Sequence, residues 1–177
     1  SESAPALQPE SEPTPRAPAA TEDDPVQRLS AVAAKLVAEQ KSRSLVVSVA
    51  ARSGTTAVDL ARELAAAGRV ILIDLAAHTR AASQIASDAS VGGVAELVRG
   101  ERSFGDVIVR DRGSRVHVIG IGELKEDAAS LVVSERLATA LDALASSYDH
   151  LVVDAGGFGD VPPKLLGRLA PHAILVA

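Results

Sequence analysis

The chain has 177 residues, and 47% of them are hydrophobic, which is enough to form the core of one domain. It contains no cysteine, so disulfides and cysteine-based metal sites are excluded, and no apolar run approaches the ~18 residues that span a membrane. The formal net charge is −5, and six acidic residues against Arg16 within residues 1–25 account for all of it. The remainder is balanced and lacks the basic footprint of a nucleic-acid-binding domain.

Residues 1–25 differ in composition from the rest of the chain. They hold six of the nine prolines, separated mainly by alanine, serine and glutamate. Such a segment buries too little apolar surface to offset its ordering entropy, so we expect a disordered linker in residues 1–25. The folded domain is expected in residues 26–177. Because the chain starts at serine and contains no methionine, we expect a piece of a longer protein, truncated at the C-terminus, with any membrane segments outside it.

Helical and strand patterns alternate through the rest of the chain. Apolar residues recur on one face after Asp24-Pro25, which predicts a first helix over residues 26–42. Further helices are predicted over residues 55–68, closed by Gly68, and over residues 130–148 and 162–170, with helical turns in 91–100 and 104–111. Strands are predicted over residues 44–50, 69–76, 115–122, 150–156 and 172–177.

The predicted strands are apolar throughout and are separated by helices. This pattern is typical of a parallel β-sheet flanked by helices on both faces, so the predicted fold class is α/β. The strand order is not readable from the pattern. The four histidines (His78, His117, His150 and His172) are too scattered for a local metal-ligand pair and are expected at the surface or at strand ends. Ligands of parallel α/β folds bind at the carboxyl ends of the strands, where we therefore place the candidate sites.

The first strand ends in "VAARSGTT", which has part of a phosphate-binding loop. Gly54 lies where such a loop has its second glycine, and Thr56 lies where a hydroxyl ligates Mg²⁺. Thr55 occupies the lysine position and cannot supply its charge, which at 4 Å from a phosphate charge is worth about 4 kcal/mol at an effective dielectric of 20. Arg52 and Ser53 lie inside the loop. Arg52 is expected to be exposed, although it could instead fold back onto a phosphate.

Two further strand ends carry carboxylates. Asp74 follows "VILI" and Asp154 follows "HLVV". Nucleotidases hold Mg²⁺ and the attacking water with carboxylates at such positions. Alternatively, an aspartate that ends a parallel strand caps the following turn or helix, which accounts for either residue alone.

The order of these elements resembles the cytoplasmic domain of bacterial tyrosine kinases and polysaccharide co-polymerases. These are relatives of the deviant phosphate-loop ATPases that position division septa and plasmids. The similarity covers about residues 24–177, and its more specific parts are "GGVAELVRGERSFGDVIVRD" and "SSYDHLVVDAGG". It implies a fold like that of phosphate-loop nucleotidases, in the deviant Walker A class.

The departures from the family pattern concern its chemistry. Thr55 replaces the lysine, and Asp74 keeps the first acid of the Asp-x-Asp strand while Ala76 replaces the second. The C-terminal tyrosine cluster has no counterpart, since the one tyrosine, Tyr148, is expected to pack before a strand. The acidic-arginine motif used in ring formation is not recognisable in the first helix. The loop (residues 52–56), Asp74 and Asp154 are therefore interpreted as vestigial.

The resemblance then implies a non-catalytic cytoplasmic domain of an inner-membrane polysaccharide co-polymerase, acting in exopolysaccharide biosynthesis or export. Its expected partners are further copies of itself and other synthesis or export proteins, with no catalytic residue, metal or cofactor. The full-length protein is expected at the cytoplasmic face of the bacterial inner membrane. Two alternatives stay open. One is a tyrosine autokinase that binds ATP and Mg²⁺, with Arg52 or a partner's residue replacing the lysine. The other is a nucleotide switch of the septum-positioning or plasmid-partitioning type.

Overall fold

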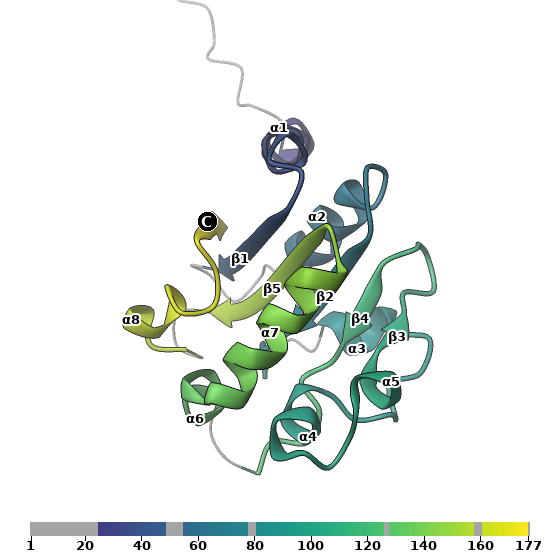
Figure 1. Cartoon of the computed structure of the whole chain (residues 1–177). Coiled ribbons are helices and arrows are strands. Elements are labelled where there is room, and N and C mark those ends of the chain that lie inside the picture. Colours follow the sequence, from purple (N-terminus) through teal and green to yellow (C-terminus); the bar gives the residue numbers. More distant parts are fainter. Residues whose placement is uncertain (1–24, 49–54, 78–80, 126–127, 158–160, 177) are drawn as a thin grey trace, which may run out of the picture.

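The computed structural model describes residues 25–48, 55–77, 81–125, 128–157 and 161–176. They form a six-stranded sheet in the order β3-β4-β2-β5-β1-β6, in which only the β3–β4 pair is antiparallel (Figure 1). The predicted α/β class is confirmed. The strands are β1 (Ser42–Ser48), β2 (Val70–Asp74), β3 (Val109–Arg110), β4 (His117–Ile119), β5 (His150–Gly157) and β6 (His172–Val176).

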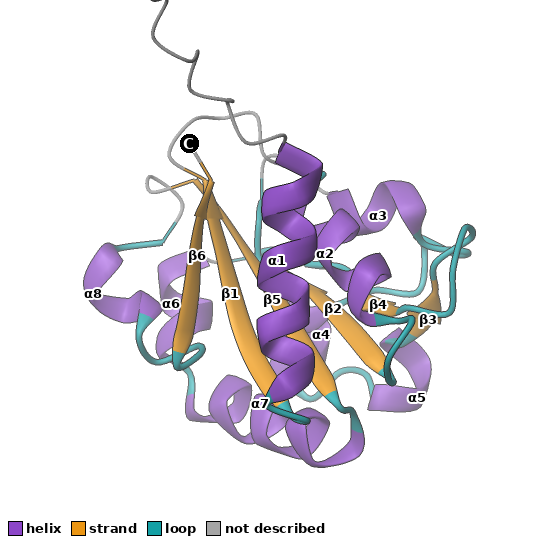
Figure 2. Ribbon diagram, turned by 90° about the horizontal axis from the view of Figure 1, so that it is seen from above, coloured by secondary structure: helices purple, strands orange, loops and turns teal. Residues whose placement is uncertain are grey.

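Helices cover both faces of the sheet (Figure 2). Residues of α1 (Pro25–Ala38), α2 (Thr56–Leu64) and α3 (Ala81–Ile85) belong to the apolar cluster on one face. The cluster on the other face includes residues of α4 (Val94–Arg99), α5 (Phe104–Val107), α6 (Ala128–Val133) and α7 (Glu135–Ser147), with α8 (Pro163–Leu166) against it. Alternate strand residues enter opposite clusters, as Leu72 does between Ile71 and Ile73. The uniformly apolar strands β2 and β5 are thus explained by burial on both sides, whereas the edge strand β6 is largely exposed.

Two helices end earlier than the periodicity predicts. The first ends at Ala38 because the apolar repeat stops there and Gln40 adopts a positive φ of 63°. The backbone N–H of Ser42 then donates to Asp149, so this residue begins β1 instead of ending the helix. The second helix ends at Leu64, and Gly68 is not its left-handed cap. An added Cβ at Gly68 would lie 3.0 Å from the Asp149 side chain, so glycine serves a close approach there.

Other predicted helices are divided or replaced. The helix expected over residues 130–148 is two helices, because Ser134 takes an extended conformation (φ −64°, ψ 127°) at the start of α7. Within the turn expected over residues 104–111, Val109–Arg110 form β3 against β4. The short α3 was not predicted, and the helix expected over residues 162–170 is reduced to α8.

The linker predicted in residues 1–25 falls, except for Pro25, outside the described residues. Pro25 itself is the first residue of α1, which therefore begins one residue before the predicted boundary. Among the helices that the structure describes, none combines the length and apolar character needed to cross a bilayer.

His150 lies at the start of β5 with 2% of its surface exposed, and its Nδ1 lies 2.8 Å from the Ser42 hydroxyl. Burial lowers the pKa of His150, although the Asp149 charge opposes the shift. A histidine with a depressed folded pKa is protonated first in the unfolded chain. Stability should therefore fall as the pH drops below the ordinary value of about 6.5, by at most about 1.4 kcal/mol per pH unit for this one proton. We expect urea denaturation between pH 7 and pH 5 to show a smaller loss for His150→Gln than for the wild type.

Candidate functional site

The candidate phosphate loop joins β1 to α2. Its residues Arg52, Ser53 and Gly54 lie outside the described residues, so only its last two members can be placed. Thr55 is exposed at the N-terminal end of α2 with helical backbone angles (φ −98°, ψ −27°). Its hydroxyl makes no capping hydrogen bond in the described structure, and Thr56 is half-buried in the first turn. The position at which the resemblance implies a lysine thus presents a neutral side chain at the helix end.

The two aspartates of the predicted site lie side by side. Asp74 ends β2 and pairs directly with Asp154 on the neighbouring strand β5. Both are buried, with 0% and 3% of their surface exposed. The carboxyl ends of β2 and β5 therefore bring together the two acids that the sequence placed 80 residues apart.

Backbone N–H groups donate hydrogen bonds to both carboxylates. Asp74 accepts hydrogen bonds through Oδ1 from the N–H of Ala76 (2.8 Å) and through Oδ2 from the N–H of Ala82 in α3 (3.1 Å). Asp154 accepts one through Oδ1 from the N–H of Gly156 (2.9 Å). Each aspartate thereby stabilises the turn that follows its strand, and Asp74 also holds the start of α3. The capping role weighed for these residues is realised in the structure.

Ala76 is the position at which the resemblance implies a second acid. It is fully buried, and its N–H donates to Asp74. A carboxylate at this position would have to enter the core next to Asp74. The described part of the site therefore provides one strand-end carboxylate on β2 and one on β5, with no lysine at Thr55.

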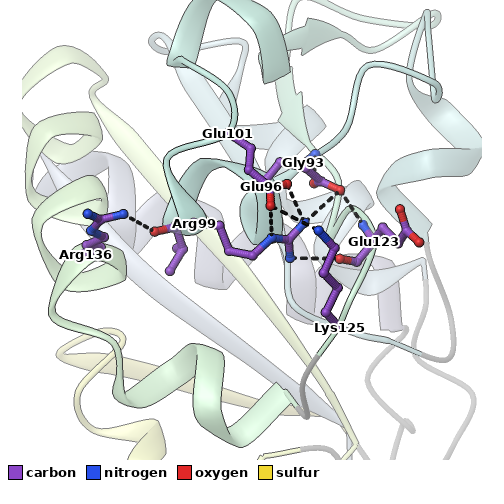
Figure 3. A network of polar contacts seen from close by, with 8 residues as sticks. Gly93, Glu96, Arg99, Glu101, Glu123, Lys125 and Arg136 are labelled. Carbon is purple, nitrogen blue, oxygen red and sulfur yellow. Dashed lines mark hydrogen bonds and ion pairs between the residues drawn. The ribbon is translucent and has the colours of Figure 1, made fainter.

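Residues of the "GGVAELVRGE" segment form a network of hydrogen bonds and ion pairs with Lys125, here called the polar clamp (Figure 3). Its members are Gly93, Glu96, Arg99, Glu101 and Lys125. Glu96 accepts the N–H of Gly93 through Oε2 (2.7 Å) and that of Glu123 through Oε1 (2.8 Å). Burial alone would raise the pKa of Glu96, but these N–H donors and the Arg99 charge hold it below its ordinary value.

Arg99 completes the clamp with Nε and Nη2 on Glu101 (2.8 and 2.9 Å), and Lys125 lies 3.1 Å from the same carboxylate. The clamp fixes α4 to the segment after β4. Glu96 and Glu101 therefore have a structural role, since their carboxylate oxygens bond other residues of the chain.

The residues that sequence reasoning missed lie elsewhere. Asp111 receives two hydrogen bonds from Arg62 of α2, and three arginines gather at the edge of the sheet where β2, β4 and β5 begin and β3 ends. The available signal was the position of Arg69, Arg110 and Arg115 at strand boundaries in "GRVIL" and "VRDRGSRVH". Periodicity cannot show that these boundaries meet at one edge of the sheet.

No protein-family model and no curated protein matches the chain. Among solved structures, it is similar to the kinase domain of VpsO, at 22% identity and TM-score 0.62, over 88% of this chain and 83% of that one. The kinase domain of the Escherichia coli tyrosine kinase ETK has 18% identity and TM-score 0.69, over 86% and 63%. A ParA family ATPase from Chlorobium tepidum TLS has 14% identity and TM-score 0.58, over 76% and 60%. The fold is therefore that of bacterial tyrosine kinase domains and ParA-type ATPases.

Proposed function

We propose that this chain is a non-catalytic cytoplasmic domain of an inner-membrane polysaccharide co-polymerase. It acts in exopolysaccharide biosynthesis or export by forming oligomers and docking on other synthesis or export proteins. The observation that carries the proposal is the neutral Thr55 at the N-terminal end of α2, in a fold shared with the VpsO and ETK kinase domains. The fold supplies the scaffold, and the loss of the lysine removes the charge that a terminal phosphate requires.

The described residues do not fit ATP and Mg²⁺ in the manner of the kinases. Thr55 offers no charge. The buried Ala76 stands where a second acid would accompany Asp74. Both oxygens of Asp74 already accept backbone N–H groups. A magnesium ion bound through water would meet a carboxylate committed to local structure, so no phosphoryl-transfer step is assigned to the domain.

Titration with ATP and Mg²⁺ tests the absence of nucleotide binding. We expect no binding heat and no magnesium-dependent rise in melting temperature for the wild type. Thr55→Lys should introduce detectable ATP binding because it restores a charge worth about 4 kcal/mol in such a site. Thr139→Lys is the matched control, since it adds the same charge at an exposed position on α7 and should leave ATP binding absent. Micromolar ATP binding by the wild type would overturn the proposal.

The second candidate is an active tyrosine autokinase or a nucleotide switch of the MinD or ParA type. The similarity to the ETK kinase domain and to a ParA family ATPase favours it. In that case Arg52 or a residue from a partner replaces the lysine. Asp154→Asn separates the two candidates in cells that carry the full-length protein. The amide retains the oxygen that accepts the Gly156 N–H, so a scaffold should keep its polysaccharide output while a magnesium-dependent enzyme should lose it.

A further inference from the structure

A cavity of about 510 Å³ opens at the edge of the sheet opposite the two aspartates. Its wall includes the turn after α2 (residues 66–69), the first residue of β2, and the first residue of β4, His117. Tyr148 and Asp149, directly before β5, complete it with Arg110 and Arg115. Because β2 pairs in parallel with β4 and β5, these positions share the amino edge of the sheet.

The charges in this cavity are strongly one-sided. Three guanidinium groups line it, from Arg69, Arg110 and Arg115, against the single carboxylate of Asp149. That carboxylate accepts the backbone N–H of Arg69 at 2.8 Å and lies 4.0 Å from Nε of the same residue, so one of the three guanidinium groups is paired within the cavity. The guanidinium of Arg110 makes no hydrogen bond or ion pair with any other residue that the structure describes. A surplus of positive charge is thus concentrated here in a chain whose net charge is −5.

The opposite edge has the reverse character. A cavity of about 280 Å³ beyond the end of β4 is lined by three charged residues, all acidic: Asp88, Glu96 and Glu123. The positive cavity is therefore not part of a generally basic surface. A concave site lined mainly by positive charge concentrates the electric field and attracts an anion of matching size.

The wall of the positive cavity is held in place by internal contacts. Arg115 donates through Nη2 to the carbonyl of Ala65 at the end of α2, at 2.8 Å. The hydroxyl of Tyr148 lies 2.6 Å from Nδ1 of His117, and the two rings meet edge to face with centroids 5.6 Å apart. Burial lowers the pKa of His117, and the charge of Arg110 lowers it further. The positive charge in the cavity therefore acts on His117 as well.

We propose that this basic pocket (Arg69, Arg110, Arg115, His117, Tyr148 and Asp149) binds a small phosphate-bearing compound. Guanidinium groups recognise phosphate oxygens in a planar, forked geometry and stay charged at every physiological pH. The half-buried ring of Tyr148 and the side chains of Ala66 and Ala67 give the pocket an apolar side for the organic part of such a ligand. The site is independent of nucleotide binding at the other edge of the sheet.

Tyr148 makes the proposal directly measurable. It is the only tyrosine in a chain without tryptophan, so tyrosine fluorescence reports on this pocket alone. Phosphate and pyrophosphate serve as probes at physiological ionic strength, with sulfate for comparison. We expect a saturable change in fluorescence, with pyrophosphate binding more tightly than either phosphate or sulfate because it carries more charge and more oxygens for the guanidinium groups.

The double substitution Arg110→Gln, Arg115→Gln should weaken pyrophosphate binding by about tenfold or more, which is ~1.4 kcal/mol or more. Arg28→Gln with Arg102→Gln is the matched control, because both arginines are exposed outside the pocket, and it should leave the affinity unchanged. Arg110→Gln alone, at an exposed side chain, covers the case in which the Arg115 change unfolds the domain. No saturable change with pyrophosphate, binding of sulfate as tight as that of pyrophosphate, or equal weakening in the control would each overturn the proposal.

Discussion

Gly93→Ala should destabilise the domain by at least about 3 kcal/mol, the upper part of the range for overpacked interiors. Gly93 precedes α4 with an extended backbone, so conformation is not the obstacle. The obstacle is space: an added Cβ would lie 2.0 Å from the carbonyl oxygen of Gly120 and 2.5 Å from the nitrogen of Gly122. Both neighbours are backbone atoms and cannot rotate away. Urea denaturation with a free energy of unfolding extrapolated to water measures the effect.

Gly105→Ala is the control within the same sequence segment. Gly105 lies inside α5, and an added Cβ there would meet the Ser103 hydroxyl at 3.8 Å, an ordinary contact. Alanine also has a higher helix propensity than glycine, so this change should be neutral or stabilising by up to about 1 kcal/mol. A loss of similar size in both variants would show that the close approach of Gly93 is not the cause.

The sequence predicts the architecture because both faces of the sheet are covered. A strand such as Val70–Asp74 is apolar at four successive positions, which only burial on both sides explains, and the intervening helices follow. The meeting of Asp74 and Asp154 was also predictable, since both end parallel strands. Their hydrogen bonds were not. Whether a strand-end carboxylate faces a ligand or a backbone N–H depends on the turn after it.

The failures share a physical cause. Periodicity reads apolar spacing and misses single residues that redirect the chain, as Ser134 does between α6 and α7 and Gln40 does after α1. The basic pocket and the Arg62–Asp111 pair escaped for another reason. Their members lie in separate segments of the chain, with 80 residues between Arg69 and Asp149 and 49 between Arg62 and Asp111, and these segments meet only through the strand order. That order is a property of long-range packing, which no local pattern contains.

The strand order also brings α2 and the β3–β4 connection together, and the second large effect is expected there. Arg62→Gln should destabilise the domain by about 2–3 kcal/mol near neutral pH. The Asp111 side chain is fully buried, and Arg62 donates to it through Nε (2.8 Å) and Nη2 (2.9 Å). The Arg62 hydrogen bonds, assisted by Ser114 and Gly113, hold the pKa of Asp111 at about 2, against an ordinary value of 3.8. Without Arg62, the Asp111 carboxylate stays buried and keeps only the hydrogen bonds from the Ser114 hydroxyl and the Gly113 N–H.

The pH dependence distinguishes this pair from a general loss of packing. Because the folded pKa of Asp111 is depressed, its stabilisation is complete above about pH 4 and is lost as the pH falls from 3.8 towards 2. The difference in unfolding free energy between wild type and Arg62→Gln should therefore shrink across that window. The control is Asp142→Ala, which removes an ion pair of 2.6 Å with Arg43. Asp142 is 74% exposed, so solvent screens the pair and its loss should amount to less than about 1 kcal/mol. An equal effect of the two substitutions at neutral pH would contradict the assignment, because Asp111 is buried with two hydrogen bonds from Arg62 and Asp142 is exposed with one from Arg43.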